Sequence, residues 1–301
     1  MNRRGGLIPV VIGLLLSLLA AGCRTSPIVD LQLTGTLLPI DDARAERVLD
    51  RYLELARSRS ALRGSARVLL EGPDFKLNRP QRILVERPAR IRFEVIGLFD
   101  QLVAVLATDG RRFDFYDASD GSISRGRVAP TLLWDLAKID LDVHEVVGLL
   151  LGAPIPSPGL ARAGVWLEPG GGLVLAFAWS GDEPGTNCSE DATSSLLDAD
   201  CFVSSEALDE GGEIFLFDVD GRLAEVRGLD PGGVIRFRAT FEDFEPFDGD
   251  ADEVDFPNRV TIHSPGAESL ARFVWKRVML AEELPSRLFM IPGRGARNQE
   301  G

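Results

Sequence analysis

Apolar and polar residues alternate with a period of two along most of the chain between residues 61 and 278. Residues 91–95 and 113–115 show the pattern clearly, and Asp109-Gly110 and Asp120-Gly121 stand where tight turns are needed. Alternation of this kind is typical of β-strands with one buried face, and Asp-Gly pairs favour hairpin turns. The pattern therefore predicts an antiparallel sheet built from consecutive strands.

Three segments have a helical period instead. Residues 41–57 form an amphipathic pattern that opens with two acidic residues, and residues 130–139 and 142–151 each carry one apolar face. Because the helices are grouped and do not alternate with strands, a doubly wound fold is excluded. We expect an α+β fold: an incomplete, strongly curved antiparallel β-barrel of about eleven strands, with helices covering or plugging its open side.

The N-terminal segment has the features of a targeting signal. Arg3 and Arg4 precede an apolar stretch over residues 7–19, which is too short to span a bilayer as a helix. The segment ends in Ala20-Ala21-Gly22-Cys23, which resembles the lipobox of bacterial lipoproteins. That resemblance implies a signal peptide over residues 1–22 and a lipidated Cys23 at the start of a tether, residues 23–41. The alternative is an ordinary secretory signal in which the cysteine is incidental.

Composition limits the possible partners. The formal net charge is −13 at pH 7, and 45% of the residues are hydrophobic. The hydrophobic share is enough for a sizeable core. The acidic excess opposes binding to nucleic acid or to anionic headgroups, because both require clustered Lys and Arg. We expect membrane contact through the lipid on Cys23, and no nucleic-acid partner.

Two further cysteines, Cys188 and Cys201, lie in the polar stretch 180–210. In an oxidising envelope compartment two such cysteines are expected to pair, and a loop of this size would gain about 3 kcal/mol from the bond. A redox or metal role is the alternative, but there is no Cys-x-x-Cys and no nearby histidine. We expect a stapled loop over residues 181–210.

Signatures of catalysis and of metal binding are absent from the sequence. His144 and His263 have no partner at metal-ligand spacing, and no nucleophile elbow, phosphate loop or dinucleotide fingerprint occurs. In the acidic stretch 242–255, Asp248, Asp250 and Asp252 stand at alternate positions like the start of a calcium loop, but Glu253 and Arg259 stand where that loop needs Gly and Glu. We expect a solvated acidic loop, no metal, no cofactor and no enzymatic activity.

Several sequence segments of the body occur in the same order as in a known family. They are residues 90–101 (RIRFEVIGLFDQ), 102–107, 108–117 (TDGRRFDFYD), 147–156 (VGLLLGAPIP), 256–262 (FPNRVTI) and 270–276 (LARFVWK). In this order they resemble the LolA/LolB-like superfamily of envelope lipid carriers, which includes the outer-membrane lipoprotein receptor of the Lol pathway. The resemblance implies a barrel domain over residues 42–284 with an apolar cavity for acyl chains, followed by a tail, residues 285–301.

The resemblance also implies a hydrophobic loop that assists insertion into the membrane. The matching position is Leu98, followed by Phe99, and the alternative is that both side chains fold back onto the sheet. The apolar residues expected either to line a cavity or to fill a core are Phe93, Val95, Val103, Val105, Phe113, Phe115, Leu133, Leu150, Phe177, Phe215, Phe217, Phe273 and Trp275.

These expectations combine into one function and one rival. The function is a monomeric, lipid-anchored protein of the outer membrane, facing the periplasm, that binds acyl chains of other lipoproteins or lipids and receives them from a periplasmic carrier. The stretch 181–210, the acidic stretch 242–255 and the residues after Leu284 depart from the family pattern. They leave room for a paralogue that handles another lipid or partner. The rival is a structural or interaction lipoprotein of an envelope assembly that docks through the stapled loop and the acidic stretch, and an envelope hydrolase is a third alternative.

Overall fold

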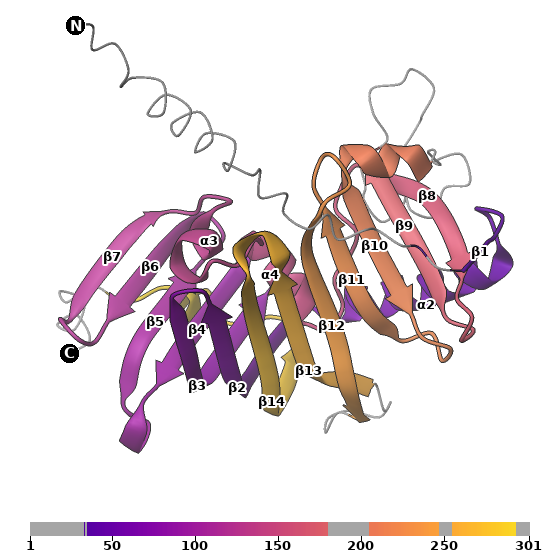
Figure 1. The fold of residues 1–301 in the computed structure, drawn as a ribbon. Coiled ribbons are helices and arrows are strands. Elements are labelled where there is room, and N and C mark those ends of the chain that lie inside the picture. The colour runs from indigo at the N-terminus through magenta and orange to yellow at the C-terminus, as the bar shows by residue number, and fades with distance from the viewer. Residues whose placement is uncertain (1–32, 34, 180–204, 247–254, 293–301) are drawn as a thin grey trace, which may run out of the picture. The chain divides into compact units, whose positions relative to one another are not determined.

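One antiparallel sheet of 14 strands forms the body, in the order β1-β8-β9-β10-β11-β12-β13-β14-β2-β3-β4-β5-β6-β7 (Figure 1). The structure is a computed structural model that describes residue 33 and residues 35–179, 205–246 and 255–292. Residues 31–301 make one compact unit. The end strands β1 and β7 do not pair with each other, so the sheet stays open.

The strands follow the expected period of two but are longer than expected in several places. Their bounds are β1 Thr36–Leu37, β2 Ala61–Gly72, β3 Phe75–Glu86, β4 Arg90–Ile96, β5 Leu102–Thr108, β6 Arg112–Asp117, β7 Ser122–Arg127, β8 Leu160–Leu167, β9 Leu173–Trp179, β10 Gly212–Phe217, β11 Leu223–Leu229, β12 Ile235–Pro246, β13 Asp255–Ser264 and β14 Ser269–Ala281.

Three α-helices and four short 3₁₀ turns complete the described part. They are α2 Ala43–Ser58, α3 Leu132–Ala137, α4 Val143–Leu150, η1 Leu98–Asp100, η2 Ser205–Glu210, η3 Pro265–Ala267 and η4 Ser286–Phe289. The acidic residues before α2 and α4 act as N-caps: Asp42 accepts from the Arg44 amide at 2.9 Å, and Asp142 forms a capping box with Glu145. None of the described helices is long and apolar enough to cross a membrane.

The chain closes its meander by pairing β14 with β2. Their register runs from Ala61 opposite Ala281 to Glu71 opposite Leu270. This pairing joins β2–β7 to β8–β14 in one sheet, so residues far apart in sequence share one concave face.

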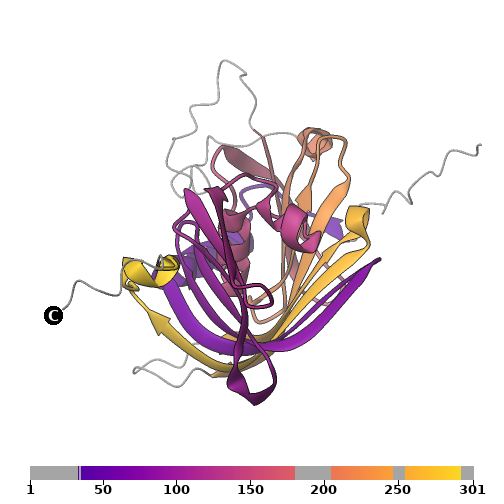
Figure 2. The ribbon, with the colours of Figure 1, turned by 90° about the vertical axis from the view of Figure 1, so that its left-hand side faces the viewer.

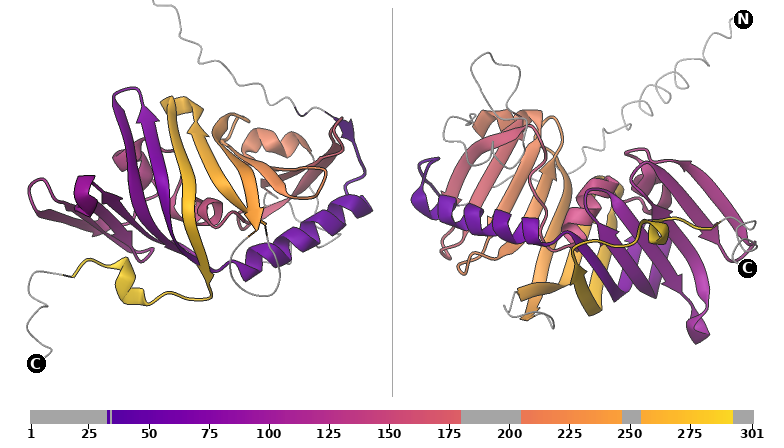
Figure 3. Two further views of the ribbon diagram at one scale, coloured as in Figure 1. Left: turned by 90° about the horizontal axis from the view of Figure 1, so that it is seen from below. Right: turned by 180° about the vertical axis from the view of Figure 1, so that it is seen from behind.

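The three helices lie on that concave face. Figure 2 shows the sheet curling around α3 and α4, and Figure 3 shows α2 crossing the strands of the β8–β12 part of the sheet. Leu49, Tyr52 and Leu53 of α2 are buried in the same core cluster as Phe215 and Phe217 of β10. The expected open, curved antiparallel sheet with helices on its open side is confirmed.

The strand count exceeds the expected number because two strands lack the apolar signal. Strand β1 has only 2 residues, and β7 reads Ser-Ile-Ser-Arg-Gly-Arg. Both are edge strands, and an edge strand needs neither length nor a continuous apolar face. Edge position therefore explains why the alternation pattern did not reveal them.

The C-terminal segment after β14 packs on the outer, convex face of the sheet. Leu284 and Phe289 are buried there against Ala61 and Leu84. Charged side chains of the strands form hydrogen bonds with the main chain of this segment: Arg92 donates to the carbonyl of Leu288 at 3.1 Å. The segment from Leu284 to Pro292, called the strap below, is thus part of the packed body.

Candidate functional site

An apolar cavity of about 250 Å³ lies on the concave face, beneath α3. Its walls come from β2–β6, β13 and β14, and from α3, the turn after it and α4. The lining residues are Val68, Leu70, Leu77, Gln81, Phe93, Val95, Ala104, Leu106, Phe115, Leu133, Leu136, Ala137, Ile139, Val146, Ile262, Ala271 and Phe273. Gln81 is the single polar residue in this described lining. The site offers no charge and no nucleophile, so its chemistry is that of apolar burial.

Some of the residues proposed from the sequence line this cavity. They are Phe93, Val95, Phe115, Leu133 and Phe273. The sequence reasoning missed Val68 and Leu70 of β2 and Ala104 of β5. Their alternate positions along their strands were a usable signal, because side chains two apart share one face.

Other proposed residues fill the neighbouring half of the concave face. Leu150, Phe177, Phe215, Phe217 and Trp275 belong to the buried core. Tyr52 of α2 stacks edge-on against Phe217 with ring centroids 5.1 Å apart, and Phe177 meets Phe215 at 5.6 Å. Aromatic rings therefore fill the core between α2 and β9–β10, a pocket of about 190 Å³ borders α2 beside Tyr52 and Leu223, and the apolar hollow lies under α3.

Two proposed residues lie elsewhere. Val103 is 40% exposed and Val105 is buried, and both stand on the face of β5 opposite to Ala104 and Leu106. Phe113, in contrast, lies on the same face of β6 as Phe115 and packs against the main core cluster, as expected. The β5 pair was misplaced because that strand is apolar on both faces.

A second pocket of about 230 Å³ lies beyond α4 and contains a buried carboxylate. Glu213 at the start of β10 is 9% exposed and accepts from the Ser157 amide at 3.2 Å and from the Ser157 hydroxyl. Burial raises the pKa of Glu213 to about 7. Burial also raises the pKa of Glu145, although Arg236 donates to it and opposes that shift.

The link between α4 and β8 is held by side chains that donate to its carbonyl oxygens. Arg59, 1% exposed, donates to the carbonyls of Leu151 and Gly152, each at 3.2 Å. Arg87 donates to Ala153, and the Tyr52 hydroxyl donates to Pro154. Burial lowers the pKa of Arg59 to about 10. These donors fix α4, which separates the apolar cavity from the Glu213 pocket.

The β4–β5 loop carries the two apolar residues proposed for membrane insertion. Leu98 is 66% exposed and Phe99 is 99% exposed. Phe99 and Asp100 both adopt left-handed backbone angles, with φ of 63° and 60°. In this loop the two side chains point away from the sheet and do not fold back onto it.

The remaining proposed positions have no structural test. Cys23, Cys188 and Cys201 lie outside the described residues, as does most of the acidic stretch 242–255. In the described ranges no three His, Cys, Asp or Glu side chains gather as a metal site.

No family model and no curated protein matches the sequence. Among solved structures, a LolA superfamily protein from Nitrosomonas europaea is 12% identical, with 81% of this chain and 97% of that chain covered and a TM-score of 0.45. A domain named as an outer membrane lipoprotein-sorting protein from Vibrio parahaemolyticus is 10% identical, with coverage of 81% and 95% and a TM-score of 0.48. A DUF1329 family protein from Desulfovibrio piger is 12% identical, with coverage of 82% and 96% and a TM-score of 0.44. All three TM-scores lie below 0.5, and membership of the LolA/LolB-like superfamily stays a prediction from the sequence.

Proposed function

We propose that this protein is a lipid-binding lipoprotein without enzymatic activity that shelters acyl chains in the cavity beneath α3. Its place is the periplasmic face of the outer membrane, where the lipid on Cys23 holds it, and its task is the localisation or insertion of other lipoproteins. The observation that carries the proposal is the apolar cavity beneath α3, whose described lining has Gln81 as its one polar residue.

The size and chemistry of the cavity fit part of one acyl chain. Its volume of about 250 Å³ corresponds to about eight water molecules at ~30 Å³ each. Each methylene buried there would contribute about 0.8 kcal/mol. A longer part of the acyl chain would fit only if α3 shifted. Such a shift would cost little, because only Leu132 and Leu133 of this short helix are buried.

The β4–β5 loop supports the same function from outside the cavity. Phe99 contributes nothing to the core, because it is 99% exposed. An aromatic side chain held out in this way can instead enter the acyl boundary of a membrane, where its burial is favourable.

The test is photo-crosslinking of the full chain with palmitic acid that carries a diazirine, followed by mapping of the labelled peptides. We expect label on β4, β5 and β14. Ala104→Phe fills the cavity and should reduce the label there, because Ala104 lines it. The matched control is Val274→Phe, which adds the same ring on the convex face, where Val274 is 39% exposed.

Two outcomes would overturn the proposal. One is a wild-type chain that takes no label on the lining strands. The other is equal labelling of the two variants when circular dichroism shows both folded. Either result would favour the rival, an interaction lipoprotein.

A further inference from the structure

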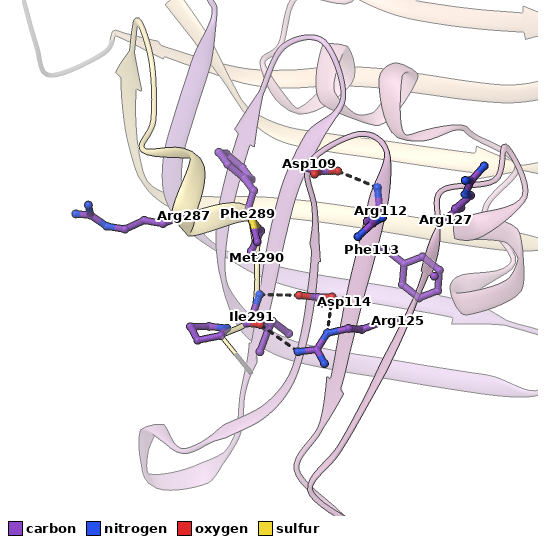
Figure 4. Close-up of a pocket in the computed structure, with 12 residues that line it drawn as sticks. Asp109, Arg112, Phe113, Asp114, Arg125, Arg127, Arg287, Phe289, Met290 and Ile291 are labelled. Carbon is purple, nitrogen blue, oxygen red and sulfur yellow. Dashed lines mark hydrogen bonds and ion pairs between the residues drawn. The ribbon is translucent and has the colours of Figure 1, made fainter. Parts of the chain in front are cut away.

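A groove of about 850 Å³ lies on the convex face, between the strap and the β6–β7 hairpin (Figure 4). Phe289, Met290 and Ile291 of the strap form one wall. Arg112 and Arg127 stand on the other. The groove is separate from the acyl cavity, because Arg112 and Asp114 alternate along β6 with the inward-facing Phe113 and Phe115.

Two charged side chains of the groove, Asp114 and Arg125, already form hydrogen bonds and an ion pair within the protein. Asp114 accepts from the Ile291 amide at 2.8 Å and pairs with Arg125 at 3.1 Å, and Arg125 donates to the Ile291 carbonyl at 3.3 Å. These bonds hold the strap against β6 and β7, as the dashed lines in Figure 4 show. Asp114 and Arg125 are therefore neutralised and add no free charge.

Arg112 and Arg127 differ from that pair. They are direct cross-strand partners in the β6–β7 register, and neither has a side-chain ion pair with any described residue. Like charges placed directly opposite each other destabilise a sheet. An anion between the two guanidinium groups would remove that repulsion and form charge-assisted hydrogen bonds.

Protection of the sheet edge does not explain both residues. Charged side chains on an edge strand discourage pairing with other chains, which accounts for Arg127 on β7. Arg112 lies on β6, which is paired on both sides. Its position facing Arg127 requires another explanation.

The strap wall indicates what kind of anion fits. Met290 is 56% exposed, and Ile291 adds apolar surface to the groove. Free phosphate would use the arginines and leave this wall in water. A phospholipid headgroup uses both, because its phosphate is followed by apolar chain.

We propose that this groove binds the anionic headgroup of a membrane phospholipid, with its phosphate between Arg112 and Arg127 and its first methylenes against the strap. The acidic net charge of −13 argued against such contact, but the fold gathers two unpaired arginines that are separated in sequence.

The test is hydrogen exchange of the full chain on two kinds of vesicle, phosphatidylcholine alone and equal parts of phosphatidylcholine and phosphatidylglycerol. We expect the vesicles that contain phosphatidylglycerol to slow amide exchange in residues 112–127 and 286–292 about tenfold relative to phosphatidylcholine alone. A ligand present at ten times its Kd gives protection of this size. The double variant R112A/R127A should lose this difference. R112K/R127K should keep most of it, since the charge remains. R47A/R51A on exposed positions of α2 is the matched control and should behave as wild type.

Each contrary outcome contradicts one part of the proposal. Equal protection on both vesicles overturns the requirement for an anionic headgroup. Protection that persists in R112A/R127A overturns the site. If glycerol 3-phosphate added to phosphatidylcholine vesicles gives the same protection, the anion needs no acyl chain. That result overturns the proposal that the ligand is a phospholipid. None of these results depends on the acyl cavity, which the palmitate experiment tests separately.

Discussion

Asp100 accepts a hydrogen bond on each carboxylate oxygen from Nη2 of Arg82, both at 3.1 Å. The two side chains are 75% and 52% exposed, and an exposed pair of this kind contributes about 0–1 kcal/mol to stability. The pair therefore acts mainly on geometry: it ties the end of the β4–β5 loop to β3. Asp100 follows Phe99 directly, so this contact is made next to the exposed ring.

We predict that Phe99→Gly leaves the thermal midpoint unchanged or slightly higher. Phe99 has a φ of 63°, and a left-handed backbone costs a residue with a Cβ about 1–2 kcal/mol. Glycine removes that strain, offset by its larger entropy in the unfolded chain. Insertion of the full chain into a lipid monolayer should fall at the same time, because the exposed ring is lost.

Val219→Gly is the control for that variant. Val219 is also apolar and 72% exposed, but it lies in the turn between β10 and β11. It should leave monolayer insertion unchanged. A Phe99→Gly protein that inserts as well as wild type would remove the loop from the proposed function.

The fold was predictable where local signals are strong. Asp42 and Asp142 mark the starts of α2 and α4 because acidic side chains cap helices, and the period of two marks the long strands. Strand β7 was not predictable, because Ile123 is its only large apolar residue. Its existence depends on pairing with β6, which is a tertiary contact.

The hollow part of the concave face could not be told by sequence from the part filled with aromatic rings. Phe93 and Phe215 occupy equivalent inward positions on their strands, yet Phe93 lines the cavity and Phe215 is packed. The difference comes from α2, whose Tyr52 lies against Phe215 with ring centroids 6.2 Å apart. Which strands a helix covers is decided by the whole topology and by no local pattern.

The buried carboxylate of Glu213 predicts a pH dependence of stability. Its pKa is about 7 in the folded protein against 4.5 for an ordinary glutamate. Between these values the unfolded chain releases a proton that the folded chain keeps. The contribution is therefore fully present below pH 4.5 and is lost as the pH rises through about 7. The loss amounts to roughly 3 kcal/mol at most.

Glu213→Gln should remove that slope, because an amide does not titrate and its oxygen can still accept from Ser157. Urea unfolding of both proteins between pH 5 and pH 8 measures it. Glu210→Gln, an exposed neighbour in η2, should keep the wild-type slope. Identical slopes in wild type and Glu213→Gln would show that Glu213 is charged throughout this range.

Truncating the strap should be costly at one position and harmless at the next. Phe289 is 1% exposed and Met290 is 56% exposed. Phe289→Ala opens a cavity against Leu84 and should lower the free energy of unfolding by about 3 kcal/mol, whereas Met290→Ala should change it little. Equal midpoints in urea for the two variants would mean that the strap is not packed in solution.

Arg59→Met should be among the most destabilising substitutions in the chain. Besides Leu151 and Gly152, Arg59 donates to the carbonyl of Asp255 at 2.7 Å. Methionine keeps much of the aliphatic volume but leaves all these carbonyls without their donor in a buried site. Unsatisfied buried acceptors cost about 1–3 kcal/mol each, so we expect the free energy of unfolding in urea to fall by ~3 kcal/mol or more.

Arg59→Lys should recover only part of that stability, because one ammonium lacks the planar fork that reaches the end of α4 and the start of β13 together. Arg57→Met, exposed in the last turn of α2, should cost almost nothing. If it cost as much as Arg59→Met, the loss would reflect helix α2 itself and not the carbonyl contacts.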